Sequence, residues 1–276
     1  MTHEVPGTVG ELAAEVLHGM AGPPPAELVA TSVFWLHHGT RLAGGDTTYL
    51  NHYVLVRLGG SFGACAFEAG ELGPEICREY SGAPVDSLLS GPAALRIAAL
   101  DAYLAETNPH REAPGAERVE LPAGPPEVRA RARDAAVAGL LDIRPGAKVG
   151  LIGVVNPLVD AIRQRGGDCL PCDLNLRSTQ WGDRVTDSMD EVLDLADSVV
   201  ATGMTLGNGS FDRILSRCRE RGLPLVVYAQ TGSAVARAFL GSGVTAVSAE
   251  PFPFSQFSAE PTTLYRYRAG TAEEQG

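Results

Sequence analysis

The chain has 276 residues, of which 45% are hydrophobic and 20% charged, the balance of a folded globular protein rather than of a disordered one. The formal net charge of -11 argues against a nucleic-acid backbone or an anionic membrane as the main partner, because both attract clustered Lys and Arg. No apolar run approaches the ~20 residues of a spanning helix, residues 1–11 lack signal-peptide features, and the 5 cysteines are scattered, so we expect a cytoplasmic protein with reduced thiols.

The first half of the chain is predicted to contain a helix, a small antiparallel sheet and a second helix. Apolar residues recur at helical spacing over residues 5–19, and the prolines at 23–25 end that helix. Two β-rich segments with glycine turns follow: residues 31–42 and 49–67, with a hairpin turn at 44–46 and a turn or bulge at 59–60. An Ala- and Leu-rich helix over residues 93–105 should close the sheet with its apolar face.

Proline and glycine cluster between the two halves of the chain, at 112–115 and 122–126. These residues interrupt both helix and strand. We therefore predict an α+β domain at 1–112, a linker at 113–126, a second domain at 127–270 and a disordered tail at 271–276.

Strands and helices alternate after the linker, which is typical of a parallel sheet covered on both faces. The predicted strands are 148–155, 169–174, 198–203, 223–229 and 244–248, with an edge strand at 265–268. The predicted helices are 126–141, 157–165, 188–196, 210–221 and 233–240. The predicted fold class is therefore α/β, with a Rossmann-like doubly wound parallel sheet in the carboxy-terminal domain and a smaller α+β domain before it.

Small and polar residues follow four of these strands, and ligands of open parallel sheets bind at the carboxyl ends of strands. The loop of residues 202–210 is rich in Gly, Thr, Ser and Asn and feeds a helix start, whose backbone N–H groups lack intrahelical partners. We predict ligand- or cofactor-binding roles in these loops for Asn156, Asp173, Asn175, Thr202, Gly203, Thr205, Gly209, Ser210 and Thr231.

Two of these positions have competing interpretations. Asp173 either accepts ribose hydroxyls, as an acidic residue does in dinucleotide sites, or is a solvated residue or helix cap. Asn208-Gly209 either binds ligand or forms a plain tight turn. The segment around Gly150 and Gly153 lacks the full G-x-G-x-x-G spacing, which argues against an ordinary nicotinamide site.

Adjacent histidines offer one candidate for acid–base chemistry. In an extended strand His37 and His38 point to opposite faces, so only one of them can face a given pocket. A hairpin could bring His38 near His52 or Asn51. We take His38, Asn51 and Asn208 as candidate catalytic residues, against the alternative that such histidines are structural.

The C-x-x-C spacing of Cys169 and Cys172 suits a soft metal or a redox pair. Both cysteines lie within a predicted strand, and no second C-x-x-C completes four zinc ligands. Burial as reduced structural thiols is therefore the favoured interpretation, and the metal ligands, if a metal binds, are unknown.

Residues 199–212 are similar to the T-G-T-T-x-x-N-G-[ST]-x-[DE] signature of the putative heavy-metal chelation family. Met204 departs from the usual Thr, and the matching residues are Thr202, Gly203, Thr205, Asn208, Gly209, Ser210 and Asp212. Residues 90–102 resemble the family's Ala-rich helix, with Asp101 where Asn is frequent, and residues 149–157 resemble its first Rossmann strand and loop. The resemblance implies an enolase amino-terminal-like α+β domain packed on a Rossmann-like domain, with a pocket between them.

Three functions stay open on these grounds. The first is a protein that binds a metal ion, a metal chelate or another small molecule in the inter-domain cleft, with Asp173, His38, Asn208 and the Thr202 loop as first candidates. The second is an enzyme that transfers a group from S-adenosylmethionine or cyclises it. In that enzyme Asp173 would contact the ribose and Asn156 the amino-acid portion, with Asn208 or Thr205 orienting the acceptor.

The third function is a non-catalytic assembly module. The aromatic segment from Phe252 to Phe257 would then mediate a homodimer contact. The alternative for the same segment is a lid over the pocket.

Overall fold

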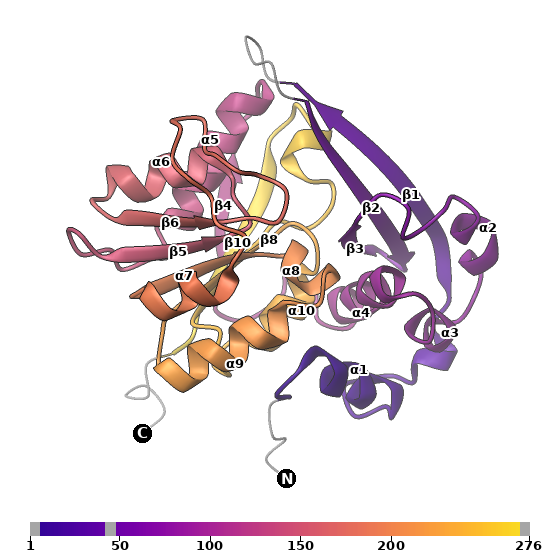
Figure 1. Cartoon of the computed structure of the whole chain (residues 1–276). Coiled ribbons are helices and arrows are strands. Elements are labelled where there is room, and N and C mark those ends of the chain that lie inside the picture. The colour runs from indigo at the N-terminus through magenta and orange to yellow at the C-terminus, as the bar shows by residue number, and fades with distance from the viewer. Residues whose placement is uncertain (1–5, 42–47, 271–276) are drawn as a thin grey trace.

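The amino-terminal half contains a three-stranded antiparallel sheet in the order β1-β2-β3 (Figure 1). The computed structural model describes residues 6–41 and 48–270, so the predicted turn at 44–46 and tail at 271–276 lie outside the described residues. The elements of this half are α1 (Val9–Leu17), η1 (Pro25–Glu27), β1 (Ala30–Thr40), β2 (Tyr49–Leu58), β3 (Ser61–Phe67), α2 (Ile76–Tyr80), α3 (Val85–Leu89) and α4 (Ala93–Thr107).

Helix α4 lies directly on β3, as the apolar pattern of residues 93–105 predicts. A Cβ atom at Gly63 would lie 2.0 Å from the backbone nitrogen of Ala102 and 2.2 Å from the carbonyl oxygen of Ala98. Only a residue without a side chain allows this approach. The close packing fixes α4 against one face of the small sheet and leaves the other face to meet the second half of the chain.

The second half contains a seven-stranded sheet in the order β4-β10-β9-β8-β7-β5-β6. Strands β6, β5, β7, β8 and β9 are parallel, and β4 and β10 run antiparallel to their neighbours. The strands are β4 (Glu117–Leu121), β5 (Lys148–Ile152), β6 (Asp168–Cys172), β7 (Ser198–Thr202), β8 (Leu225–Ala229), β9 (Ala246–Ala249) and β10 (Thr262–Arg268). The helices are α5 (Pro126–Ala138), α6 (Asn156–Gln164), α7 (Met189–Leu195), α8 (Met204–Gly207), α9 (Phe211–Arg221), α10 (Ser233–Ala238) and η2 (Ser255–Phe257).

Helices cover both faces of this sheet (Figure 1). Val200 of β7 and Val226 of β8 pack with α5 and α6, whereas their neighbours Val199 and Val227 pack with α7, α9 and α10. Alternation along each strand therefore directs apolar side chains into both layers. The protein has the predicted doubly wound α/β architecture, and none of its described helices is long and apolar enough to span a membrane.

The segment predicted as a linker contains a strand. Residues 117–121 form β4, which pairs antiparallel with β10 at the edge of the large sheet. Val119 and Leu121 alternate with charged residues and pack against α5. The strand has only five residues and lies between residues rich in proline and glycine. Its alternation of apolar and charged residues is therefore too short to be recognised in the sequence. Strand β10 is correspondingly longer than predicted, because it pairs with both β9 and β4.

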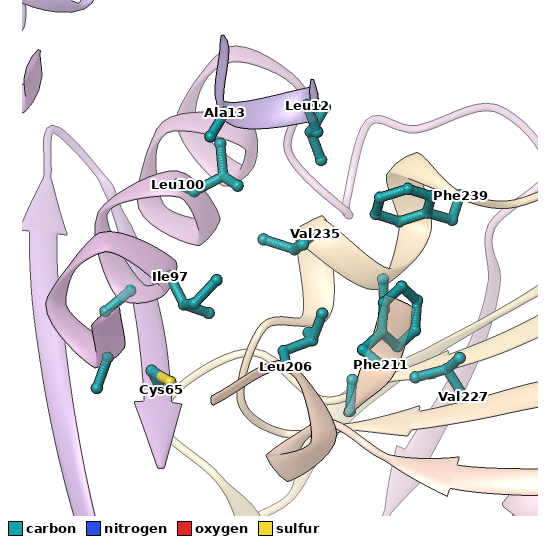
Figure 2. Packing of buried hydrophobic residues seen from close by; sticks show 14 of the residues in the cluster. Leu12, Ala13, Cys65, Ile97, Leu100, Leu206, Phe211, Val227, Val235 and Phe239 are labelled. Atoms are coloured by element: carbon teal, nitrogen blue, oxygen red, sulfur yellow. The ribbon is translucent and has the colours of Figure 1, made fainter. Parts of the chain in front are cut away.

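The two halves share one hydrophobic core. A single cluster contains Leu12 and Leu100 from the amino-terminal half and Leu206, Phe211 and Val235 from the other half. Figure 2 shows α1 and α4 facing α10 across this cluster, with Leu206 of α8 beside them. The junction at α8 and α10 is therefore filled by packed side chains, and it fixes how the loops of the large sheet meet the small one.

Candidate functional site

The strand order reverses between β5 and β7, so the loops that follow these two strands diverge at this point. Thr202 is the last residue of β7 and is 6% exposed, and its hydroxyl has no hydrogen-bond partner among the described residues. Gly153 follows β5 with φ +87°, and a Cβ there would lie 2.4 Å from Thr202 Oγ1. The glycine therefore lets the turn after β5 lie directly against the hydroxyl.

Two predicted site residues build the loops around this point. Asp173 accepts hydrogen bonds from Val154 N at 2.9 Å, Asn175 N at 2.8 Å and Leu176 N at 3.1 Å. Both of its carboxylate oxygens thus join the loops after β5 and β6. We call Gly153, Asn156, Asp173 and Thr202 the switch-point corner.

Asn156 begins α6 and faces the long loop between β6 and α7. Its side-chain oxygen accepts a hydrogen bond from Gln180 N at 3.0 Å. The loop is therefore held beside the amino end of α6, and it carries Trp181, which is 44% exposed. Predicted residue Asn175 is exposed in the same loop and contributes its backbone nitrogen to Asp173.

The loop after β7 folds into the short helix α8. The Thr205 hydroxyl donates to the carbonyl of Thr202 at 2.7 Å. Gly203 lies against the next loop, because a Cβ there would be 2.1 Å from the carbonyl oxygen of Thr231. Thr205 and Thr231 are both buried. The contacts of Gly203, Thr205 and Thr231 therefore fix the conformation of the loop after β7. Met204 in this loop is 42% exposed.

The Asn208-Gly209-Ser210 segment forms the tight turn that the sequence offered as one alternative. Asn208 Oδ1 accepts from Ser210 N at 3.1 Å and from Ser210 Oγ at 2.7 Å, and Gly209 has φ +76°. The turn leads into α9. The Asn208 side-chain oxygen and the Ser210 hydroxyl therefore bond to each other within the turn.

His38 and Asn51 are cross-strand partners in β1 and β2, while His37 pairs with His52. His38 Nε2 lies 3.0 Å from Thr40 Oγ1, and its ring centre is 5.1 Å from that of Phe257. Burial lowers the pKa of His38, so the ring is neutral at pH 7. No hydrogen bond joins His38 to Thr202 or Asp173 in the described part of the chain, so the two predicted groups remain separate.

A polar cluster that the sequence reasoning missed lies where β8 and β9 end. Gln230 Nε2 donates to Glu250 Oε2 and to Gln256 Oε1, both at 2.8 Å. Glu250 is fully buried, and burial raises the pKa of nearby Tyr53 to about 12. Gln230 and Glu250 each come directly after a buried strand, which is the signal that could have selected both.

The aromatic segment is anchored in the chain by Phe254, whereas Phe257 is 37% exposed. Phe254 is fully buried and packs with Tyr53 and Leu55 of the small sheet. Arg129 is also buried, and it donates to the carbonyl oxygens of Ser255 and Glu260. The segment therefore fills the space between the free face of the small sheet and the end of β9.

A serine–histidine–tyrosine row joins α10 to β10. Ser233 Oγ lies 3.1 Å from His110 Nε2, and His110 Nδ1 lies 2.8 Å from the Tyr267 hydroxyl. In hydrolytic enzymes a nucleophile, a general base and a group that orients the base are arranged in the same way as Ser233, His110 and Tyr267 are here. Burial and the neighbouring Arg237 lower the pKa of His110 to about 3, so it is a poor proton acceptor at neutral pH. Because Ser233 is also only 3% exposed, the row is structural.

Two surface hollows lie elsewhere. One of about 130 Å³ lies between Phe62, Phe252 and Tyr265, and one of about 140 Å³ lies between β6 and α7. Both are smaller than the roughly 300–1,000 Å³ of typical small-molecule pockets. No residue of the switch-point corner lines either hollow.

One family model and two solved structures are similar to this chain. The family model described as "Putative heavy-metal chelation" (DUF364) matches residues 136–249. A solved DUF364 protein of unknown function from Desulfitobacterium hafniense has 15% identity and TM-score 0.60, covering 94% of this chain and 99% of its own. A second, from Pyrococcus horikoshii, has 16% identity and TM-score 0.51, covering 92% and 98%. Residues 136–249 of this chain thus match the DUF364 family model, and the chain as a whole shares the fold of two DUF364 proteins.

The resemblance predicted from residues 199–212 is thus confirmed, and the two DUF364 structures share the fold of the chain over nearly its whole length. Identities this low establish the fold alone. No curated protein matches the chain.

The description of the DUF364 family raises the question of which residues could hold a metal. Among the described residues, no group of three or more His, Cys, Asp or Glu side chains is arranged to hold an ion. Cys169 and Cys172 lie three residues apart in β6 and so point to opposite faces. Burial raises their pKa values to about 12 and about 11, so both are thiols at pH 7. The described residues therefore do not form a closed metal centre made of protein ligands alone.

Proposed function

We propose that this protein binds a metal chelate at the switch-point corner. The chelate consists of a metal ion held by a small polar molecule. Ligands of open parallel sheets bind where the strand order reverses, and here it reverses between β5 and β7. The observation that carries the proposal is the buried, unpartnered hydroxyl of Thr202 at this reversal. An unpaired buried hydroxyl costs folding free energy, and a hydrogen bond to a ligand would remove that cost.

The surroundings of Thr202 support a preorganised binding site. Gly153 leaves the backbone above the hydroxyl without a side chain, and Asp173 fixes the neighbouring loop through three backbone amides. Rigid loops lower the entropy that a ligand loses on binding. Exposed Trp181 and Met204, on the two loops that flank the corner, offer apolar surface to the rest of the ligand.

A chelate suits the chain better than a free ion at this corner. The described residues provide no set of three metal ligands, so most of the coordination must come from the small molecule. A hydroxyl group such as that of Thr202 recognises the polar oxygens of a chelator. This class of ligand also agrees with the description of the family.

Calorimetric titration with zinc citrate tests the proposal. The parent protein carries His37→Phe and His52→Phe, so that these two imidazoles contribute no heat. Thr202→Val keeps the shape of the side chain and removes the hydroxyl. We expect zinc citrate to bind the parent and to bind Thr202→Val roughly tenfold more weakly, as the loss of one hydrogen bond implies. Citrate alone and zinc alone are titrated separately to show which component is recognised.

Ser248→Ala is the matched control. Ser248 in β9 also has a buried hydroxyl without a partner, but it lies away from the reversal between β5 and β7. Both substitutions should stabilise the free protein by about 1 kcal/mol, because each removes an unpaired buried hydroxyl, whereas only Thr202→Val should weaken binding. No heat with the parent, or equal affinity in both variants, would contradict the proposal.

A further inference from the structure

A pair of imidazoles on the small sheet lies apart from the switch-point corner. His37 of β1 and His52 of β2 are direct cross-strand partners. Their ring centres are 4.0 Å apart with an angle of 47° between the planes. His37 is exposed and His52 half-buried, and neither ring forms a hydrogen bond to a described residue. Both rings are thus open to an incoming ion.

Neighbouring aromatic rings hold the two imidazoles in place. The Trp35 ring centre lies 3.9 Å from that of His37, and the Phe67 ring centre lies 5.6 Å from that of His52. Trp35 itself is fixed, because its indole nitrogen donates to the carbonyl of Leu72 at 3.0 Å. Phe67 is buried. The row of four rings therefore restricts the imidazoles before any ligand binds.

We infer that His37 and His52 form a two-point binding site for a single divalent transition-metal ion, with Cu²⁺ preferred and water completing the coordination. Imidazole nitrogen suits Zn²⁺, Ni²⁺ and Cu²⁺, and Cu²⁺ binds such ligands most tightly among them. An ion about 2.0 Å from one nitrogen of each ring can bridge two rings whose centres are 4.0 Å apart. The net charge of -11 favours the approach of a cation.

The same strands contain an internal comparison. One position further along, His38 faces Asn51 on the opposite side of the sheet. There the imidazole has an amide in place of a second imidazole, and it contacts Thr40 and Phe257. The inference therefore depends on the pairing of two histidines across the strands, and it does not depend on the proposed chelate site.

Titration with Cu²⁺, followed by calorimetry and electron paramagnetic resonance, tests the inference. The parent carries His3→Ala, His18→Ala and His38→Phe, which removes the other histidines except buried His110. We expect one ion per chain, with hyperfine structure from two equivalent imidazole nitrogens. Zinc added in excess should displace part of the copper, because the two ions share the same ligands.

His37→Phe and His52→Phe in this parent keep the row of aromatic rings and remove one ligand each. Removing a group that only hydrogen-bonds a metal ligand lowers metal affinity by about 10–100-fold. Removing a ligand itself should therefore lower the affinity at least roughly tenfold in either variant. Equal copper affinity in the parent and both variants, or a spectrum with a single imidazole nitrogen, would overturn the inference. A failure of the zinc citrate experiment leaves this result unaffected, because that experiment uses a protein without His37 and His52.

Discussion

The carboxylate of Asp101 in α4 accepts a hydrogen bond from the backbone nitrogen of Ala234 at 2.7 Å, across 133 residues of sequence. The same carboxylate accepts from Ala64 N at 2.9 Å and from Val235 N at 3.4 Å. Asp101 is 2% exposed. One buried side chain therefore binds the small sheet, α4 and the first turn of α10 together.

Replacing Asp101 with alanine should destabilise the protein strongly. Asp101→Ala leaves three buried backbone amides without partners, and each such loss costs about 1–3 kcal/mol. We expect the free energy of unfolding to fall by at least about 3 kcal/mol in denaturant titrations. Asp86→Ala is the control, because the Asp86 side chain accepts one hydrogen bond, from the backbone nitrogen of the next residue, Ser87, at the surface. This substitution should change stability by about 0.5 kcal/mol or less.

Asp101 should also make stability depend on pH. Burial raises its pKa to about 6, although its amide partners and Arg237 lower it, whereas an exposed Asp has a pKa of ~3.9. The folded protein then binds the proton more tightly, so this contribution is fully present below about pH 4 and is lost as pH rises through 6. Two pKa units correspond to roughly 3 kcal/mol.

Asp101→Asn separates this effect from other titrating groups. Stability of the wild type minus that of Asp101→Asn, measured by urea unfolding from pH 4 to pH 8, should decrease as pH rises. A difference that stays constant with pH would show that Asp101 does not titrate in this range.

Gly63 should tolerate no side chain. In Gly63→Ala the new Cβ meets the backbone of Ala98 and Ala102, so β3 and α4 must separate, and we expect a loss of several kcal/mol. Gly60→Ala is the matched control, since its nearest neighbour would be 4.0 Å away. Similar melting temperatures for the two variants would contradict the packing described for α4.

The doubly wound sheet could be predicted because its strands are apolar segments separated by glycine and proline at regular intervals. Strand β4 could not be predicted, because its five residues form a strand through pairing with β10 rather than through their own preference for extended structure. The shared core was also not predictable. Contacts such as that of Asp101 with Ala234 depend on how two distant segments pack, and a single sequence carries no record of that.

Residue types at strand ends, which are a local property, were enough to select Asn156, Asp173 and Thr202 as candidates. The sequence could not show that Asp173 and Asn208 already bond to neighbouring backbone or side-chain groups. The sequence also could not show which histidines are cross-strand partners. The register of β1 and β2 decides that His37 meets His52 and His38 meets Asn51.

Cys169, Cys172 and Cys218 should react slowly with a thiol reagent at pH 7. Burial raises the pKa of Cys169 to about 12, of Cys172 to about 11 and of Cys218 to about 12, so the reactive thiolate is scarce. We expect these three thiols to react only after denaturation, when all 5 cysteines of the chain become titratable. A disulfide between Cys169 and Cys172 in the native protein would contradict their opposite orientation.

If Thr202 lies at the ligand site, an anomalous difference map should place the chelated metal beside it. Crystals of the His37→Phe/His52→Phe protein are soaked in zinc citrate, and data are collected on both sides of the zinc absorption edge. We predict one zinc peak beside the switch-point corner, with a citrate oxygen within hydrogen-bonding distance of Thr202 Oγ1. A chelate found elsewhere, such as in the hollow beside Phe62 and Tyr265, with the corner unchanged, would contradict this prediction.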